Sequence, residues 1–395
     1  MRSTTAHLAL PFFDEVHREL GQRLADWAPQ QHIDESDDRK ACKEWVALLG
    51  AEGWLRYCVP AGKDGALGGA LEKLDSRALV ILRETLAFHS PLADFAFAMQ
   101  GLGSGAITLA GTPAQQAAYL PLVASGKKIA AFALSEPDAG SDAGAMVTSA
   151  TDTGAGWALN GSKTWISNGG IADFYVTFAK TDPQGGTRGI TAFIVDADSK
   201  GLDSSEHIAV MAPHPLATLK FAHCRLPQGA QLGALHGGFK LAMQTLDIFR
   251  ASVAAAALGM ARRALAEAVR FSKERKMFGQ TLADFQLTQA KLGEMAALID
   301  SAALLTYRAA WMRDDAEKRG APAVGDVSAA AAMAKMCATE NASRVIDMAL
   351  QMHGGLGVKV GTKVESLYRD IRSLRIYEGA TEVQQLIIGK SVLKG

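Results

Sequence analysis

The chain has 395 residues and a mass of 41.7 kDa, enough for two or three domains of roughly 100–200 residues each. Basic and acidic side chains both number 41, so the formal net charge is zero and the pI is near 7.1. This balance argues against nucleic-acid binding and against a polybasic membrane surface, because both need an excess of lysine and arginine. The hydrophobic content of 48% excludes an intrinsically disordered chain.

The targeting and redox features of the sequence indicate a cytoplasmic protein. The first apolar run is short and is broken by Pro11, which makes a poor signal peptide. We expect no apolar stretch of about 18 residues that could span a membrane, and we expect the most apolar run, residues 251–261, to pack against other helices. Four scattered cysteines favour a reduced protein with neither disulfides nor a metal site. They are Cys42, Cys58, Cys224 and Cys337.

Helical periodicity dominates the first part of the chain. Apolar residues recur at three- and four-residue steps in residues 13–27 and 39–55. Thr112-Pro113 is a helix-start signal, and the helical pattern continues after it through residues 114–120. This pattern ends at about Lys128.

From Ile129 to about Cys224 the hydrophobic period falls to two, which predicts strands. Asn160-Gly161 separates two such runs and predicts a hairpin turn, because the turn needs positive φ at both positions. Further strands are expected at residues 174–179, 190–195 and 217–221. Beyond Phe239 the chain is again helical, with few breakers until Gly354. The predicted domains are 1–128 (helical), 129–235 (β) and 236–395 (helical).

Two glycine-containing segments in the first half of the chain are candidates for ligand contact. Residues 131–142, AFALSEPDAGSD, form a β-run followed by a turn rich in free backbone amides, which can bind a heterocycle or a phosphate. The alternative is a β-turn closed by aspartate and serine side chains. Residues 101–105, GLGSG, follow no strand, so we interpret them as a flexible helix break rather than a dinucleotide loop.

Three segments in the second half also have two interpretations each. Residues 351–357, QMHGGLG, end a long helix and are either a simple helix cap or a site of close ligand approach, with His353 as a hydrogen-bonding residue rather than a metal ligand. In residues 375–381, RIYEGAT, Glu378 is either a capping acid or a buried general base. Residues 275–279, RKMFG, either complement a helix C-terminus or clamp a pyrophosphate.

Taken together in this order and spacing, these segments resemble the acyl-CoA dehydrogenase family, from about Pro11 to the C-terminus. Residues 134–142, LSEPDAGSD, are similar to the first signature of the family, and residues 351–370 are similar to its second. Residues 273–279 and 376–379 are two further landmarks. The resemblance implies an α+β, mostly α fold: an N-terminal helical domain, a middle β-barrel or β-sandwich domain and a C-terminal four-helix bundle. It also implies a homotetramer that is a dimer of dimers.

The resemblance further implies an FAD cofactor lying between the β domain and the bundle. The isoalloxazine ring would be lined by residues 132–141, with Phe132, Leu134, Ser135, Gly140 and Ser141 as the main contacts. Its other side would be covered by Trp165, Ile166 and Ser167, with the Ser167 hydroxyl near N5. The FAD of a neighbouring subunit would be reached by Arg275, Gln286, Gln351, Met352, Gly354 and Gly355, and Phe278 is a further expected cofactor contact. Thr381 and Glu382 would lie by the dinucleotide.

The reaction that the resemblance implies is α,β-dehydrogenation of an acyl-CoA thioester to the trans-2-enoyl-CoA. Glu378 would take the α-proton while flavin N5 receives the β-hydrogen as a hydride. An electron-transfer flavoprotein would then accept the electrons singly. The expected substrate contacts are Ser141, Asp247, Arg250 and Gly379.

Some residues depart from the pattern of the family, and others indicate to which of its branches the chain belongs. Some members carry the base on an earlier helix, but this chain has Phe249 at that position, so Glu378 is the expected base. The bulk of Phe249 also suggests a short or branched acyl chain. Residues 211–218 lack the usual Gly-x-Arg, and Val358 replaces a common aromatic residue. Two alternatives to a dehydrogenase remain: an oxygen-reactive acyl-CoA oxidase-like relative, and a non-catalytic helical scaffold of the same fold.

Overall fold

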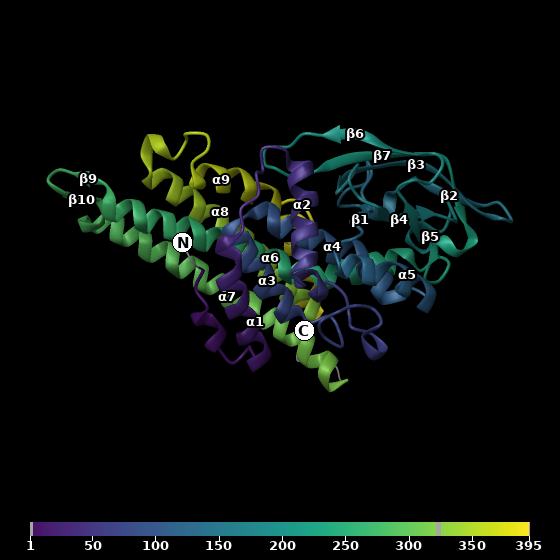
Figure 1. Ribbon diagram of the computed structural model, residues 1–395, viewed down its shortest axis with the longest axis horizontal. Helices are drawn as coiled ribbons and strands as arrows, with labels where there is room; N and C mark the ends of the chain where they lie inside the picture. The colour runs from purple at the N-terminus through teal and green to yellow at the C-terminus, as the bar shows by residue number, and fades with distance from the viewer. Residues whose placement is uncertain (1–2, 321–324, 395) are drawn as a thin grey trace. The chain divides into compact units, whose positions relative to one another are not determined.

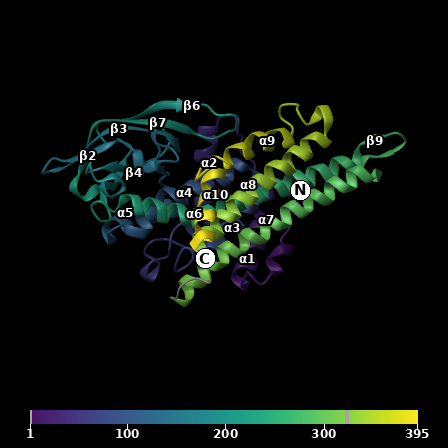
Figure 2. The same ribbon diagram turned by 180° about the vertical axis from the view of Figure 1, so that it is seen from behind.

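The computed structural model describes residues 3–320 and 325–394, drawn as ribbons in Figures 1 and 2. The helices are α1 (Glu15–Trp27), α2 (Asp38–Ala51), α3 (Ser76–His89), α4 (Pro91–Ala110), α5 (Pro113–Ala124), α6 (Gly238–Glu274), α7 (Gln286–Arg319), α8 (Val327–Met352), α9 (Lys363–Leu374) and α10 (Thr381–Lys394). The strands are β1 (Ala130–Ala133), β2 (Ser149–Asp152), β3 (Gly156–Ser167), β4 (Phe174–Lys180), β5 (Ile190–Asp196), β6 (Leu202–Ile208), β7 (Leu216–Pro227), β8 (Gln231–Leu232), β9 (Lys276–Met277) and β10 (Gln280–Thr281). The predicted order of helices, then strands, then helices is confirmed.

By their internal contacts the described residues form two compact units. We call the first the bundle unit; it comprises residues up to 32, residues 76–94 and residues from 250 onward. The second, the sheet unit, comprises residues 33–75 and 95–249. The bundle unit therefore joins α1 and α3, from the N-terminal part of the chain, to the long C-terminal helices. The predicted division into three domains at residues 128 and 235 stays a prediction.

Close helix packing builds the bundle unit. Helices α7 and α8 lie side by side (Figure 2), α7 also packs on α3, and α8 also contacts α9 and α10. Helix α6 approaches α3 at Gly259, where an added Cβ would lie 2.1 Å from the carbonyl oxygen of Glu84. Only glycine fits this crossing, since a side chain there would push the two backbones apart.

Helix α6 corrects one expectation from the sequence. By length and composition alone it is apolar enough to cross a membrane, although no such stretch was expected. However, 78% of its most apolar window is buried inside the structure, as in the core helices of soluble proteins. The run 251–261 is buried on almost every side, which confirms the predicted helix-packing role.

The sheet unit is built around an eight-stranded sheet in the order β6-β7-β3-β2-β4-β5-β8, with β1 added parallel to β4. Strands β4 and β5 are buried along nearly their whole length and form its core, whereas the edge strand β6 is largely exposed. The strands predicted at 174–179, 190–195 and 217–221 are confirmed, although β7 is longer than expected. Helix α5 begins at the predicted signal, with the Thr112 hydroxyl accepting from the backbone N–H of Gln115.

The hairpin predicted at Asn160-Gly161 is wrong, because both flanking runs belong to the single strand β3. The register of β3 against β7 shifts between Leu159 and Gly161, so the pair forms a bulge instead of a turn. The Asn160 side chain accepts from the backbone N–H of His223 across the bulge. Gly161, at φ 142°, passes so close to Thr148 that a Cβ would lie 2.6 Å from its hydroxyl oxygen.

The expected helix break at residues 101–105 is also wrong, because these residues lie within the continuous helix α4. Their glycines make room for a neighbouring side chain: a Cβ added to Gly101 or Gly105 would lie 2.6 or 2.9 Å from the ring of Phe249. Gly103 faces β1 in the same way, with Ala131 N at 2.7 Å. The glycines thus accommodate tertiary packing within a helix.

Removal of a buried ion pair in the bundle unit should strongly destabilise the protein. Arg83 donates two hydrogen bonds to Asp94, at 2.8 and 2.9 Å, and a third to the Ser252 hydroxyl at 3.0 Å. Asp94→Ala leaves the guanidinium buried without its counter-ion, so we expect the free energy of unfolding to fall by roughly 3–5 kcal/mol. Denaturant titration of the purified protein measures this loss.

The matched control is Glu206→Ala in the exposed pair Glu206–Lys220, whose side chains are 52% and 57% exposed. Its denaturation midpoint should be unchanged, because water screens an exposed pair. Equal losses in the two variants would contradict a structural role for the Arg83–Asp94 pair.

Candidate active site

The loop between α9 and α10 presents Glu378 in an unusual backbone conformation. Glu378 has φ 52° and Gly379 has φ 93°, so two successive residues are left-handed. For a non-glycine residue this conformation costs on the order of 1–3 kcal/mol, which the surrounding structure must offset. The loop is closed by a hydrogen bond from Thr381 N to Arg375 O at 3.1 Å.

One oxygen of the Glu378 carboxylate is shielded from water, and the charges that act on this group are mainly positive. Its Oε2 atom is buried and accepts no hydrogen bond. Burial raises the pKa of this carboxyl, and the positive charges of Arg83, Lys335 and Arg250 oppose that rise. Asp94 adds a smaller effect that raises the pKa further. A carboxylate in this setting can serve as a general base.

Three polar side chains that the sequence analysis did not identify hold this loop. Lys335 Nζ of α8 donates to the carbonyl of Gly379 at 2.7 Å, and Gln384 Nε2 of α10 donates to the same carbonyl at 2.8 Å. Glu340 of α8 accepts from Arg375 Nε at 2.8 Å and from the Thr381 hydroxyl at 2.6 Å. A polar residue within the alanine-rich stretch of α8 was the available signal, but polar residues in a helix usually face solvent.

The predicted contacts around the base occupy different settings. Arg250 is 6% exposed, and its charge acts on Glu378. Asp247 is half-buried one turn earlier on α6. Thr381 and Glu382 begin α10, where Thr381 is bonded to Glu340 and Glu382 is exposed.

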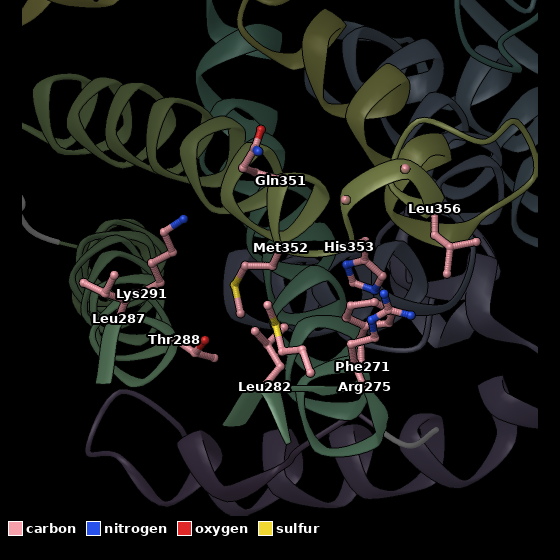
Figure 3. Close-up of a pocket in the computed structure, with 13 residues that line it drawn as sticks. Phe271, Arg275, Leu282, Leu287, Thr288, Lys291, Gln351, Met352, His353 and Leu356 are labelled. Carbon is pink, nitrogen blue, oxygen red and sulfur yellow. The ribbon is translucent and has the colours of Figure 1, made fainter. Parts of the chain in front are cut away.

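The bundle unit contains a pocket of about 550 Å³ near the end of α8 (Figure 3). Arg275, Gln351, Met352, Gly354 and Gly355, all predicted cofactor contacts, line it together. A Cβ added to either glycine would meet no other atom within 4 Å, so the backbone there faces open space. Met277, His353 and Leu356, which also line the pocket, belong to the segments 275–279 and 351–357 that were singled out from the sequence. The sequence analysis missed the remaining lining residues, which are Phe271, Leu282, Leu287, Thr288 and Lys291.

His353 takes the predicted hydrogen-bonding role. Its Nδ1 lies 2.7 Å from the carbonyl oxygen of Ala349, and its ring stacks on Phe271 with centroids 4.4 Å apart. Figure 3 shows this stacked pair beside Arg275. Gly354, at φ 56°, follows the end of α8, so this segment is both a helix cap and a pocket wall. Among residues 3–320 and 325–394, no group of three His, Cys, Asp or Glu side chains is arranged to hold a metal ion.

Two predicted contacts lie outside this pocket. Phe278 is 87% exposed at the tip of the β9–β10 hairpin, which projects beyond the ends of α6 and α7 (Figure 1). Gln286 is exposed at the first position of α7. Residues 275–279 therefore form most of a hairpin that follows the end of α6, rather than the helix end itself.

In the sheet unit, a buried ion pair holds the turn that follows β1. Glu136 is 4% exposed and accepts from Lys163 Nζ at 2.8 Å and from the backbone N–H groups of Val147 and Thr148. Lys163, which is wholly buried, also donates to the carbonyl of Leu134 at 2.9 Å. A turn is present here, and it is closed by backbone hydrogen bonds that Glu136 and Ala139 exchange, not by the aspartate and serine side chains of the predicted β-turn.

This ion pair joins the two segments that were predicted to cover the flavin. Thr164 N donates to the carbonyl of Ser135 at 3.0 Å, so residues 132–141 and 165–167 start from neighbouring positions. Phe132 is partly exposed, Gly140 and Ser141 are exposed, and Leu134 and Ile166 are buried.

Trp165 and Ser167 have specific local settings. Trp165 has φ 59° at a second bulge of β3 and is 59% exposed, a large apolar ring held outward by the backbone. The Ser167 hydroxyl lies 3.2 Å from His214 Nε2. His214 belongs to residues 211–218, the segment that lacks the usual Gly-x-Arg. Burial lowers the pKa of His214 to about 3, so this imidazole is neutral at physiological pH.

Both units have features that fit a flavin dinucleotide. In the sheet unit, the exposed Trp165 offers an apolar face to a flat ring, and a Cβ added to Gly140 would meet no atom within 4 Å. In the bundle unit, Arg275 beside the open backbone of Gly354 and Gly355 suits a pyrophosphate, which a guanidinium binds through paired hydrogen bonds.

Comparison with known proteins identifies the family. Residues 13–127 match the family model described as "Acyl-CoA dehydrogenase, N-terminal domain". Residues 131–224 match the model of the middle domain of that family, and residues 236–393 match the model of its C-terminal domain. Similar relatives include a caffeyl-CoA reductase-Etf complex subunit of Acetobacterium woodii, which is 40% identical over 97% of this chain and all of the relative. A 3-(aryl)acrylate reductase of Clostridium sporogenes is 38% identical over 97% of this chain and all of the relative.

The structure of butyryl-CoA dehydrogenase from Megasphaera elsdenii superposes with a TM-score of 0.87. It is 32% identical in sequence, and the match covers 96% of this chain and 99% of that one. The chain therefore belongs to the acyl-CoA dehydrogenase family of FAD-dependent oxidoreductases, which act on CH–CH bonds.

Proposed function

We propose that the protein removes the α- and β-hydrogens of an acyl-CoA thioester, giving the trans-2-enoyl-CoA, with Glu378 as the base. The carboxylate of Glu378 carries this assignment, because its Oε2 is buried without a hydrogen bond and the charges of three cations act on it. An unbonded oxygen can accept a proton from carbon without first giving up another partner. Glu378 also argues against the non-catalytic scaffold, which would not need a buried carboxylate in a strained loop.

In this mechanism, Glu378 Oε2 accepts the α-proton while the surrounding residues control its charge. Burial raises the pKa of the carboxyl and makes it a stronger base, and the charges of Arg83, Lys335 and Arg250 oppose that rise and favour the ionised form. The backbone N–H of Glu378 would donate to the thioester carbonyl and stabilise the developing enolate. Bound FAD supplies the acceptor for the β-hydride.

The cofactor contacts follow the two sets of residues described above. Phe132, Leu134, Ser135, Gly140, Ser141, Trp165, Ile166 and Ser167 would hold the isoalloxazine ring. The pocket of Figure 3 would receive part of the FAD of a neighbouring subunit at Arg275, Gln351, Met352, Gly354 and Gly355, with Phe278 and Gln286 nearby. Thr381 and Glu382 would contact the dinucleotide, and Ser141, Asp247, Arg250 and Gly379 the substrate.

An electron-transfer flavoprotein is the proposed electron acceptor, supported by the A. woodii relative, which is a subunit of an Etf complex. We also propose a cytoplasmic homotetramer with domains at 1–128, 129–235 and 236–395. Large apolar side chains exposed on the bundle unit support the association. They include Phe278, Leu287, Leu386, Val392 and Leu393, which are 87%, 81%, 62%, 70% and 89% exposed.

The proposed acyl group is short, branched or aryl-substituted. The relatives reduce a caffeyl-CoA or a 3-(aryl)acrylate, and the structural neighbour is a butyryl-CoA dehydrogenase. The bulk of Phe249 does not support this proposal, because its ring packs against Gly101 and Gly105 of α4. The same base also serves the reverse reaction, since the protonated Glu378 would return a proton to the α-carbon.

Replacing the base should abolish chemistry while leaving the cofactor bound. In Glu378→Gln we expect FAD content and visible spectrum to be unchanged, because the side chain keeps its shape. The rate of anaerobic flavin bleaching by acyl-CoA should fall by roughly 10²–10⁴-fold, the usual contribution of a positioned base. Stopped-flow absorbance measures the rate, and bleaching at the wild-type rate would show that another group takes the proton. Rapid reoxidation of the reduced wild type by oxygen alone would favour the oxidase alternative.

The pH dependence of bleaching should report the raised pKa of Glu378. The rate should increase with pH, because only the ionised carboxylate accepts the proton, and it should be lost as pH falls through the raised pKa. The midpoint of this profile should lie above about 4.3, the ordinary pKa of a glutamate. A midpoint at the ordinary value in single-turnover experiments would contradict a buried base.

Acyl-chain selectivity should follow the proposed substrate class. In anaerobic titrations we expect butyryl-CoA or a 3-arylpropionyl-CoA to bleach the flavin with a kcat/KM roughly tenfold or more above that of palmitoyl-CoA. Efficient bleaching by long straight chains would refute the substrate class while leaving the reaction type intact.

A further inference from the structure

Lys335 is a buried cation beside the base, and no predicted function accounts for it. Its side chain has no exposed surface, and it lies on α8 among the buried alanines 331, 332, 334 and 338. Its ammonium ion donates to a neutral backbone carbonyl, that of Gly379, at 2.7 Å. Burying an ammonium ion is costly unless its interactions replace those of water, and a carbonyl alone does this poorly.

The carbonyl that Lys335 holds already has a neutral donor. Gln384 Nε2 lies 2.8 Å from the same oxygen, so a second donor is not needed to satisfy it. Gly379 directly follows Glu378, and both residues have positive φ. A carbonyl bonded from α8 and from α10 fixes the peptide next to the base and so limits the positions that the Glu378 side chain can take.

The charge of Lys335 also acts on the carboxylate of Glu378. The groups that face Glu378 are Arg83 of α3, Asp94 of α4, Arg250 of α6, Lys335 of α8 and the adjacent Tyr377. Asp94 opposes the charge of Arg83, because the two form a bidentate ion pair.

The groups that face Lys335 are Glu378, Arg250, Glu340 and Glu382, and Glu378 has the largest effect among them. Burial lowers the pKa of Lys335 to about 8, so the ammonium form still predominates at neutral pH.

We propose that Lys335 is a positioning residue for the base: it holds the Gly379 carbonyl with its ammonium group and favours the carboxylate form of Glu378 with its charge. The proposal rests on the proposed function, because it assigns Lys335 a role only if Glu378 is the base. Its two components can be separated, since Gln384 shares the hydrogen bond but carries no charge.

The test measures the rate of anaerobic flavin bleaching by butyryl-CoA against pH in three FAD-loaded variants. Lys335→Met removes the hydrogen bond and the charge; we expect the maximal rate to fall on the order of 10²-fold, as for a misplaced catalytic group, and the pH midpoint to rise. Gln384→Met removes only a hydrogen bond, so the rate should fall without a shift of the midpoint. Lys335→Arg keeps the charge, so its midpoint should stay near that of the wild type.

Lys40→Met serves as the matched control, because Lys40 is a lysine with a 74% exposed side chain, and both its rate and its midpoint should equal those of the wild type. A Lys335→Met variant with the rate and midpoint of the wild type would overturn the proposal. So would failure of both Lys335 variants to fold and bind FAD, which would assign the residue to stability alone. Glu378→Gln is measured in parallel: if it still bleaches, the proposed base is wrong, whereas an inactive Glu378→Gln beside an unaffected Lys335→Met refutes only the role of Lys335.

Discussion

The site depends on one constraint: a carboxylate must be kept from water and still be able to ionise. Burial alone would hold Glu378 protonated, because a low-dielectric environment disfavours the charged form. In the bundle unit, cations from three separate helices favour the ionised form of Glu378: Arg83 on α3, Arg250 on α6 and Lys335 on α8. Since these helices are far apart in sequence, Glu378 acquires its charged neighbours only when the N-terminal and C-terminal helices pack together.

Buried charges elsewhere in the protein are handled differently, and the contrast is informative. Arg83 pairs with Asp94, and Lys163 pairs with Glu136, so each of these charges has an opposite charge at hydrogen-bond distance. Such pairs fix the positions of segments. Glu378 instead keeps one oxygen without a hydrogen bond, and Lys335 donates to a carbonyl. Buried polar groups with incomplete hydrogen bonding lower the stability of the protein. Their presence next to a strained loop is typical of a functional site.

Much of the fold could be predicted from local patterns, and the errors share one cause. Helix α5 and strands β4 and β5 were predicted because capping and hydrophobic period depend on neighbours in sequence. Asn160-Gly161 forms a bulge because β7 pairs with both sides of it, and the glycines of α4 are present because the ring of Phe249 packs on them. Both facts depend on residues more than 50 positions away, which a local pattern does not contain.

The candidate site was predictable to the extent that its residues follow one another in short segments. Glu378 lies in such a segment, whereas Lys335 is 44 residues from Gly379, whose carbonyl it binds. A lysine in a helix normally faces water, so the sequence offers no reason to place this one inside. The alanines around it are the physical reason that it is buried: small side chains let α8 approach α10 closely, and the long lysine side chain then spans the remaining distance to the loop. The alanine-rich composition that predicts only helix packing therefore also determines how the loop that carries Glu378 is held.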